Sequence, residues 1–119
     1  MEEKKLFDSE YRFMNLVWEN EPVKSTELAR LCASAWGWKK STCYTVLKKL
    51  SERGFLKNEQ AVVTSLVPRK EVRKQESEAV VDKSFGGSLP AFVTAFLTDR
   101  KLTGKEAEEI RKMIEKAVE

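Results

Sequence analysis

The sequence contains no histidine, and only two of its 119 residues are cysteines. Histidine is the commonest general base of enzymes and a common metal ligand, so most catalytic and metal-site chemistry lacks its usual side chain here. The two cysteines, Cys32 and Cys43, are too few for a zinc finger or a disulfide framework. Neither has a neighbouring base in the sequence. We therefore expect no enzyme activity, no bound metal and no cofactor.

Long apolar segments are also missing. No run approaches the roughly 20 residues that a membrane-spanning helix requires. The first five residues, MEEKK, have the features of neither a signal peptide nor a transit peptide. We therefore expect a cytoplasmic protein that does not insert into a membrane, and no pattern in the sequence indicates a small-molecule ligand.

The excess of positive charge is small over the whole chain, but it is concentrated in one segment. The chain has 22 Lys and Arg against 19 Asp and Glu, which gives a net charge of +3. Between Lys39 and Lys57, six basic residues accompany a single acid, Glu52, for a net charge of +5. An ordinary solvated helix mixes both signs, so this segment favours an anionic partner. From charge alone, a basic surface without a partner is the alternative.

The apolar residues of the N-terminal region recur with the period of a helix. They predict a first helix over residues 7–18, with an N-cap supplied by Asp8 or Ser9. Pro22 ends this helix, because proline cannot continue the helical hydrogen bonding.

Two further helices are predicted in the first half of the chain. Ser25 suits the N-cap of a second helix that continues to about residue 35. Residues 36–38 form a turn, and the third helix covers 39–53. Gly54 then ends it, since glycine is the residue most favoured just beyond a helix C-terminus.

Two short strands are predicted after these helices. Residues 55–58 and the β-branched segment 62–67 suit strands, and 58–61 suits the turn between them. The turn lacks the glycine that is usual at the tip of a hairpin. Three helices followed by a hairpin predict a mainly α fold with a small β wing, a winged helix-turn-helix domain over residues 1–70.

Residues 71–119 are predicted to form a C-terminal helical dimerisation module. Helices are expected at 69–84, 88–98 and 104–118, the last opened by a Thr-Gly-Lys-Glu capping box. They are too short and too few to bury their apolar stripes alone, so two-fold pairing of two tails is favoured over folding back onto the first domain. The expected interface residues are Phe85, Leu89, Phe92, Val93, Phe96, Leu97, Ile110 and Ile114.

The predicted helix at 39–53 occupies the place of a DNA-recognition helix. In a helix-turn-helix, the second helix lies in the major groove and its first residues meet base edges. Its hydroxyl groups can donate to or accept from bases, and its lysines suit phosphates. The predicted base-contacting residues are Ser41, Thr42, Tyr44, Thr45 and Lys48. The predicted phosphate-contacting residues are Trp38, Lys39, Lys40, Lys49 and Lys57.

Other residues near this helix have structural interpretations. Trp36 and Trp38 flank a glycine, and core packing is expected for one of them, while Trp38 can reach the DNA backbone through its indole N–H. Cys32 and Cys43 fall on the inward sides of their helices. We expect buried free thiols there, with a redox switch between them as the alternative.

The chain resembles the penicillinase repressor family of bacterial regulators, which includes the β-lactamase and methicillin-resistance repressors. The similarity covers residues from about 6 to 118, in family-like order and length. The pattern Trp plus Ser-Thr-x-x-Thr-Val-Leu in the predicted recognition helix is fairly specific. The stretches that carry the resemblance are Leu6–Trp18, Trp38–Leu50, Arg53–Leu56, Phe92–Leu97 and Leu102–Thr103.

The resemblance implies a homodimeric transcriptional repressor that binds a double-stranded DNA operator with palindromic half-sites. It also implies release by proteolysis in the C-terminal tail, through a protease linked to a membrane sensor of β-lactams. In well-known members the cut falls at an Asn-Phe bond, and the corresponding pair here is Ala95 and Phe96. A copper-responsive branch of the family has a cysteine-rich tail, and no cysteine follows Cys43 in this chain.

Two other classes of function are alternatives to the repressor. The first is a winged-helix adaptor that binds other proteins without specific DNA binding, because one fold can serve either purpose. The net charge of +5 on the predicted recognition segment favours DNA over this alternative. The second is an enzyme, for which the sequence offers no set of catalytic residues.

Overall fold

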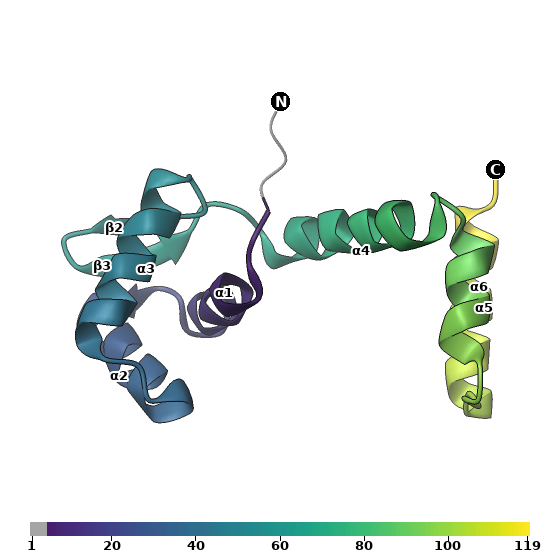
Figure 1. The fold of residues 1–119 in the computed structure, drawn as a ribbon, viewed down its shortest axis with the longest axis horizontal. Coiled ribbons are helices and arrows are strands. Elements are labelled where there is room, and N and C mark those ends of the chain that lie inside the picture. The colour runs from purple at the N-terminus through teal and green to yellow at the C-terminus, as the bar shows by residue number, and fades with distance from the viewer. Residues whose placement is uncertain (1–4) are drawn as a thin grey trace. The chain divides into compact units, whose positions relative to one another are not determined.

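A computed structural model describes residues 5–119 of the chain, and the confirmed fold is mainly α with a small β wing (Figure 1). The chain divides into two compact units, the first ending at Ser77 and the second covering Glu78–Glu119. The helices and strands of the described residues are α1 (Asp8–Asn20), β1 (Val23–Lys24), α2 (Ser25–Trp36), α3 (Lys40–Glu52), β2 (Leu56–Glu59), β3 (Val62–Ser65), α4 (Arg69–Phe85), α5 (Leu89–Leu97) and α6 (Gly104–Ala117).

The N-terminus of α1 differs from the prediction. Phe7 occupies the N-cap position, and no side chain makes a capping hydrogen bond from that residue. Instead, Oε1 of Glu10 accepts a hydrogen bond from the Phe7 N–H at 2.9 Å. The prediction of Asp8 or Ser9 as the cap is wrong, because the carboxylate of Glu10 reaches back to the helix start. Asp8 lies in the first turn, where the helix dipole favours an acid.

A two-residue strand, β1, precedes α2 and has no counterpart among the predicted elements. It pairs antiparallel with β3, which places β3 at the centre of a three-stranded sheet. The N–H of Ser25 donates to the carbonyl oxygen of Ala61 at 2.8 Å. Ser25 is therefore the first residue of α2, and Lys24 is its N-cap. The prediction of Ser25 as the cap is wrong by one residue, because strand pairing continues up to the helix.

Strands β2 and β3 form the predicted wing. They pair antiparallel, with Leu56 opposite Ser65 and Glu59 opposite Val62. The two residues between them, Gln60–Ala61, have φ angles of 52° and 63°. Glycine or asparagine ordinarily supplies such positive angles in a two-residue hairpin turn. The wing thus forms without a glycine, at some cost in backbone strain.

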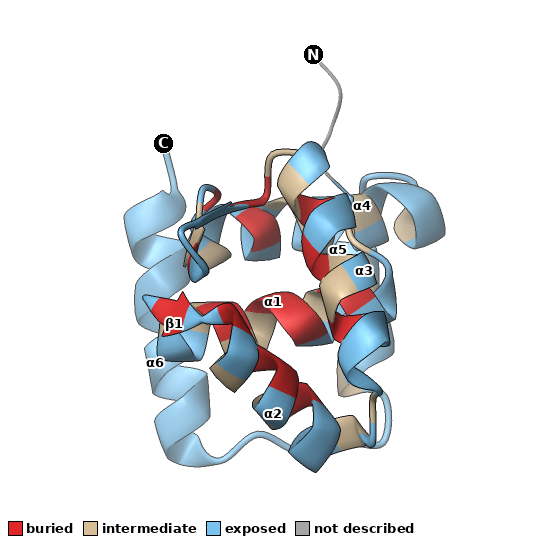
Figure 2. Cartoon of the chain, turned by 90° about the vertical axis from the view of Figure 1, so that its left-hand side faces the viewer, coloured by how far each residue is buried: buried red, intermediate tan, exposed pale blue. Residues whose placement is uncertain are grey.

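The core of the first unit lies where α1, α2, α3 and the sheet face one another (Figure 2). Each of the three helices turns one apolar side inward and one polar side to solvent, as amphipathic helices do around a core. The two cysteines are free and buried in this core, as predicted. The fully buried side chains are Phe13, Met14, Val17, Leu28, Cys32, Cys43, Leu50, Phe55, Leu56, Val63 and Val72.

The first half of α4 is part of the first unit. Val72 is 1% exposed and joins the core. The guanidinium of Arg69 lies 5.4 Å from the centroid of the Trp18 ring on α1. These contacts extend the compact unit to Ser77, further than the boundary predicted after residue 70.

In the second unit, local signals define the helices. Ser88 caps α5 by accepting a hydrogen bond from the Ala91 N–H at 3.1 Å. The predicted capping box of α6 is confirmed, since Thr103 and Glu106 each accept a hydrogen bond from the other's backbone N–H at 3.1 Å. No residue of α5 or α6 is buried. Over residues 5–119, no helix is both long and apolar enough to cross a membrane.

Candidate nucleic-acid interface

One face of α3 is exposed because the opposite face belongs to the core. Cys43, Leu47 and Leu50 are its buried residues, and their spacing is that of one side of a helix. The remaining side carries hydroxyl and ammonium groups. Its exposed polar residues include six that were predicted to contact DNA, Lys40, Ser41, Thr42, Thr45, Lys48 and Lys49, and one acid at the end of the helix, Glu52.

Two of the predicted base-contacting residues are constrained by their neighbours. Oγ1 of Thr45 donates a hydrogen bond to the carbonyl oxygen of Ser41, one turn earlier, at 2.9 Å. Tyr44 is half-buried, and Nζ of Lys40 lies 5.7 Å from the centroid of its ring. Thr45 therefore presents its methyl group and the acceptor lone pairs of its oxygen to the outside, without a free hydroxyl proton.

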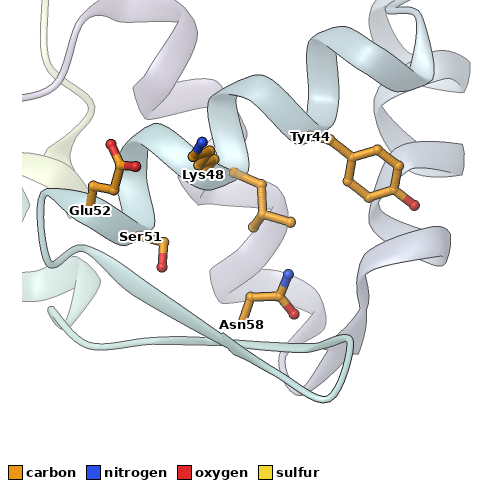
Figure 3. A pocket seen from close by; sticks show the side chains of 6 residues that line it. Tyr44, Lys48, Ser51, Glu52 and Asn58 are labelled. Atoms are coloured by element: carbon orange, nitrogen blue, oxygen red, sulfur yellow. The ribbon is translucent and has the colours of Figure 1, made fainter.

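A hollow of about 370 Å³ lies between α3 and β2 (Figure 3). The amide group of Asn58 points from β2 toward α3, and Tyr44 and Lys48 lie on the helix side. Asn58 is not among the predicted site residues, because the strand pairing that brings β2 beside α3 cannot be predicted from the residues next to it in the sequence. Its place in the strand that follows the recognition helix is the signal that could have found it. The hollow is lined by Tyr44, Leu47, Lys48, Ser51, Glu52 and Asn58.

Arg53 contributes to the charge of the basic segment, but its guanidinium is paired with a buried carboxylate. Its Nη1 lies 2.9 Å from each carboxylate oxygen of Glu10. Its guanidinium carbon also lies 5.1 Å from the centroid of the Phe55 ring. A charge held in this way is neutralised within the fold, so the positive charge available to a partner is smaller than the sequence indicates.

The lysines of the segment are in two different situations. Lys57, on the wing, has its Nζ 3.7 Å from Oε2 of Glu59, and both side chains are exposed. The other four form no ion pair with any residue that the structure describes: Lys39, Lys40, Lys48 and Lys49. The unbalanced positive charge is therefore concentrated along α3 and the residue before it.

Trp38 packs at the edge of the core. Its ring stacks on Phe13 with centroids 6.2 Å apart and lies 5.0 Å from Trp36, centroid to centroid. The side chain is half-buried, so one edge faces solvent next to the start of α3. Packing thus fixes the ring, and its contact with a phosphate stays a prediction.

The two thiols, Cys32 of α2 and Cys43 of α3, are buried between their helices. The hydrogen bond of Cys32 with Cys43, together with burial, raises the pKa of the Cys32 thiol. Both side chains are 0% exposed. Burial keeps both thiols away from oxidants in solvent, so this environment gives no support to a redox switch.

The predicted dimerisation residues leave much apolar surface uncovered in the single chain. Phe92 contacts Phe85 edge-to-face with centroids 5.5 Å apart, and it stacks on Phe96 at 6.1 Å. Outside this aromatic group, Leu89 exposes 60% of its surface and Ile114 exposes 58%. The large exposed apolar residues of α5 and α6 are Leu89, Val93, Phe96, Ile110, Met113 and Ile114.

The fold and the exposed face of α3 together define a winged-helix protein of the helix-turn-helix class. The sequence model of the family described as "Penicillinase repressor" matches residues 6–116. The chain belongs to the penicillinase repressor family, as its sequence predicts. This family consists of transcriptional repressors and not of enzymes, which confirms the expectation that the chain is not an enzyme.

Individual relatives are distant but match over most of their length. The chain is 22% identical over 112 residues to the penicillinase repressor of Bacillus licheniformis. The matched stretch covers 91% of this chain and 88% of the relative. It is 23% identical over 112 residues to the methicillin resistance regulatory protein MecI of Staphylococcus aureus strain Mu50, which covers 91% of each chain.

Two solved structures share the fold. The solution structure of the DNA binding domain of the repressor BlaI has a TM-score of 0.52 and 20% identity, covering 56% of this chain and 87% of that chain. The Bacillus licheniformis BlaI monomeric form in complex with the blaP half-operator has a TM-score of 0.51 and 21% identity, covering 57% of this chain and 88% of that chain. At this level of identity, the likeness shows the winged-helix fold.

Proposed function

We propose that the chain is a homodimeric repressor that binds a palindromic DNA operator in the cytoplasm and occludes a promoter. We assign DNA binding to the predicted domain 1–70 together with the start of α4 up to Ser77, and dimerisation to the rest of the predicted module 71–119, from Glu78 onward. The recognition segment 39–53, which contains α3, enters the major groove of each half-site. The observation that carries the proposal is the exposed face of α3, where hydroxyl groups and lysines without ion pairs lie together. The complex of BlaI with the blaP half-operator supports DNA as the partner.

The residues of this face divide by chemistry between bases and backbone. Hydroxyl groups can donate to or accept from base edges, and a lysine can donate to guanine, so they read sequence. Lysine ammonium groups at the edge of this exposed face neutralise phosphates and set the position of the helix on the DNA. We assign base contacts to Ser41, Thr42, Tyr44, Thr45 and Lys48. We assign phosphate contacts to Trp38, Lys39, Lys40, Lys49 and Lys57.

The second copy of the chain is the partner proposed for the tail. The exposed apolar residues of α5 and α6 need a cover of similar chemistry, and a second tail supplies the same surface in a two-fold arrangement. Pairing the tails also holds two recognition helices on one operator. The affinity for two half-sites then greatly exceeds the affinity for one.

Release of the operator is proposed to follow a cut between Ala95 and Phe96 by a sensor-linked protease. Both residues are exposed and lie near the end of α5, a helix of 9 residues. The cut separates α6 from the rest of the chain and so removes part of the proposed dimer interface. A loss of pairing then lowers the operator affinity without any change in α3.

A DNA-binding titration tests the proposal. Labelled duplexes recovered by selection from a randomised pool are titrated with the protein, and fluorescence anisotropy is followed at two salt concentrations. We expect saturable binding that survives excess competitor DNA and weakens steeply with salt, because each phosphate contact releases counterions. Weak binding that competitor DNA abolishes contradicts the proposal and favours the protein-binding adaptor.

The variant Lys49→Ala sharpens this test. It removes one exposed ammonium group from α3, so we expect weaker binding to every sequence and a salt slope smaller by about 1. Lys74→Ala removes an exposed lysine from α4 and serves as the matched control, with affinity and slope unchanged. An unchanged slope for Lys49→Ala contradicts the phosphate contact.

A further inference from the structure

Thr45 lies in the middle of the exposed face of α3. It is exposed and belongs to the N-terminal half of Lys40–Glu52, the half that meets base edges in a helix-turn-helix. Ser41 precedes it by one helical turn and Lys48 follows it by three residues, so these side chains share one side of the helix. Thr45 is therefore central among the residues proposed to read DNA.

The hydroxyl proton of Thr45 is already used within the helix. Oγ1 donates to the carbonyl oxygen of Ser41 at 2.9 Å. A hydroxyl group has a single proton, so Thr45 has none left to donate to a base. The same hydrogen bond restrains χ1 of the side chain and hence the direction of its methyl group. What Thr45 offers to DNA is a restrained methyl group beside an oxygen that can only accept.

Only some base pairs match such a surface. Guanine presents two acceptors in the major groove, N7 and O6, and an acceptor oxygen is repelled by both. Across the major-groove edge of an A·T pair, the N6 amino donor of adenine is followed by the O4 acceptor of thymine and then by the thymine 5-methyl group. The 5-methyl group is found on thymine alone, so the feature of this edge that the restrained methyl group of Thr45 matches is specific to thymine.

We infer that Thr45 selects a thymine in each operator half-site through contact between its methyl group and the 5-methyl group of the base. The inference rests on the proposed placement of α3 in the major groove. It assigns to Thr45 a specificity that comes from an apolar contact, whereas its hydroxyl group keeps the side chain oriented.

Deoxyuridine gives a direct probe, because it differs from thymidine in the base by the 5-methyl group alone. A duplex recovered by selection with the unaltered protein is compared with copies that carry deoxyuridine at one thymine at a time. We expect one thymine in each half-site where this exchange weakens binding roughly fourfold, the value of one buried methyl group. Equal affinity for all copies overturns the inference but leaves operator binding established. If selection recovers no duplex, the proposed function fails and the inference fails with it.

Two substitutions at the same position assign the effect to the methyl group of Thr45. Thr45→Ser keeps the hydroxyl group that bonds to Ser41 and loses the methyl group, so it should bind the thymine and deoxyuridine duplexes equally. Thr45→Val keeps a branched methyl-bearing side chain and should still prefer thymine. Thr94→Ser makes the same exchange at an exposed position of α5, outside the residues proposed to contact DNA, and as the control it should discriminate like the unaltered protein. Full discrimination by Thr45→Ser overturns the inference.

Discussion

Glu10 and Arg53 form an ion pair that ties the end of α3 to the start of α1. The Glu10 side chain is 7% exposed and that of Arg53 is 35% exposed. Glu10→Gln leaves the guanidinium without its charged partner, and we expect a loss of about 2 kcal/mol in unfolding free energy. This is less than the roughly 3–5 kcal/mol for breaking a fully buried pair, because solvent screens Arg53. Urea unfolding at pH 7, followed by circular dichroism, measures it.

Glu27→Gln is the control for this prediction. Glu27 pairs with Arg30 three residues later on the surface of α2, at 2.5 Å. Both side chains are largely exposed, so the urea midpoint should stay nearly unchanged. Equal losses for the two variants contradict the view that burial makes the Glu10 pair strong.

The wing tip holds backbone strain at Gln60 and Ala61, and glycine can relieve it at Ala61. Ala61 has a φ angle of 63°, a region that costs a residue with a Cβ atom roughly 1–2 kcal/mol. Ala61→Gly removes this cost and adds some chain entropy to the unfolded state, so we expect a net gain of about 0.5–1 kcal/mol. The measurement is the unfolding free energy from urea titration.

An alanine-to-glycine exchange inside a helix should lower the unfolding free energy instead of raising it. Ala33→Gly lies at an exposed position inside α2, where glycine costs about 1 kcal/mol relative to alanine. A loss of stability in both variants contradicts the idea of strain at the wing tip.

At the scale of residues, the sequence predicts interactions between residues that are close in the chain and does not predict interactions between residues far apart in it. Thr103 and Glu106 are three residues apart, so their capping box can be read from the sequence and is confirmed. Glu10 and Arg53 are 43 residues apart, and their pairing depends on how two helices pack. The sequence therefore counts the charge of Arg53 in the basic segment 39–57, although the fold pairs it with the buried carboxylate of Glu10.

Between elements, the contact of α4 with α1 gives the first unit a pH dependence. Burial, and then the charge of Asp8, raises the pKa of Glu76 above its ordinary value of 4.5. The folded chain then binds its proton more tightly than the unfolded chain, so Glu76 lowers stability as the pH rises through this pKa. Glu76→Gln should raise the urea midpoint at pH 7 and leave it unchanged at pH 3, where the carboxyl group is neutral in both states.

Glu78→Gln, at an exposed position two residues along α4, is the matched control and should change the midpoint at neither pH. A gain at pH 3 as large as at pH 7 for Glu76→Gln contradicts an electrostatic origin and points to the packing of the amide.

At the scale of elements, periodicity predicts α1, α2 and α3 well because each of them has one apolar side. The recognition helix predicted at 39–53 is observed as Lys40–Glu52. Strand β1 escapes prediction because a two-residue strand has no periodicity and exists only through its pairing with β3. The position of Asn58 beside α3 is not predicted either, because it depends on the pairing of β2 in the sheet.

At the scale of the whole molecule, apolar surface is covered unevenly. The first unit encloses a continuous core, whereas α5 and α6 bury no residue. A chain of 119 residues has little surplus stability to leave such surface in water. Pairing with a second copy is therefore proposed as a condition for both the stability of the tail and tight operator binding.

Phe96→Asp tests this pairing in the complete chain. Phe96 is 51% exposed on α5, and a carboxylate there opposes burial against a second copy. We expect sedimentation equilibrium to give the single-chain mass of 13.7 kDa for the variant and twice that mass for the unaltered protein. Operator affinity should fall roughly 100-fold or more, since one half-site is then bound at a time.

Thr94→Asp places the same charge at an exposed position on the other side of α5 and should remain dimeric, which separates pairing from a general effect of charge on the helix. A dimer that survives Phe96→Asp contradicts pairing through α5. The apolar residues Ile110 and Ile114 of α6 would then have to carry the contact, and the proposed cut between Ala95 and Phe96 would still release the operator because it removes that helix.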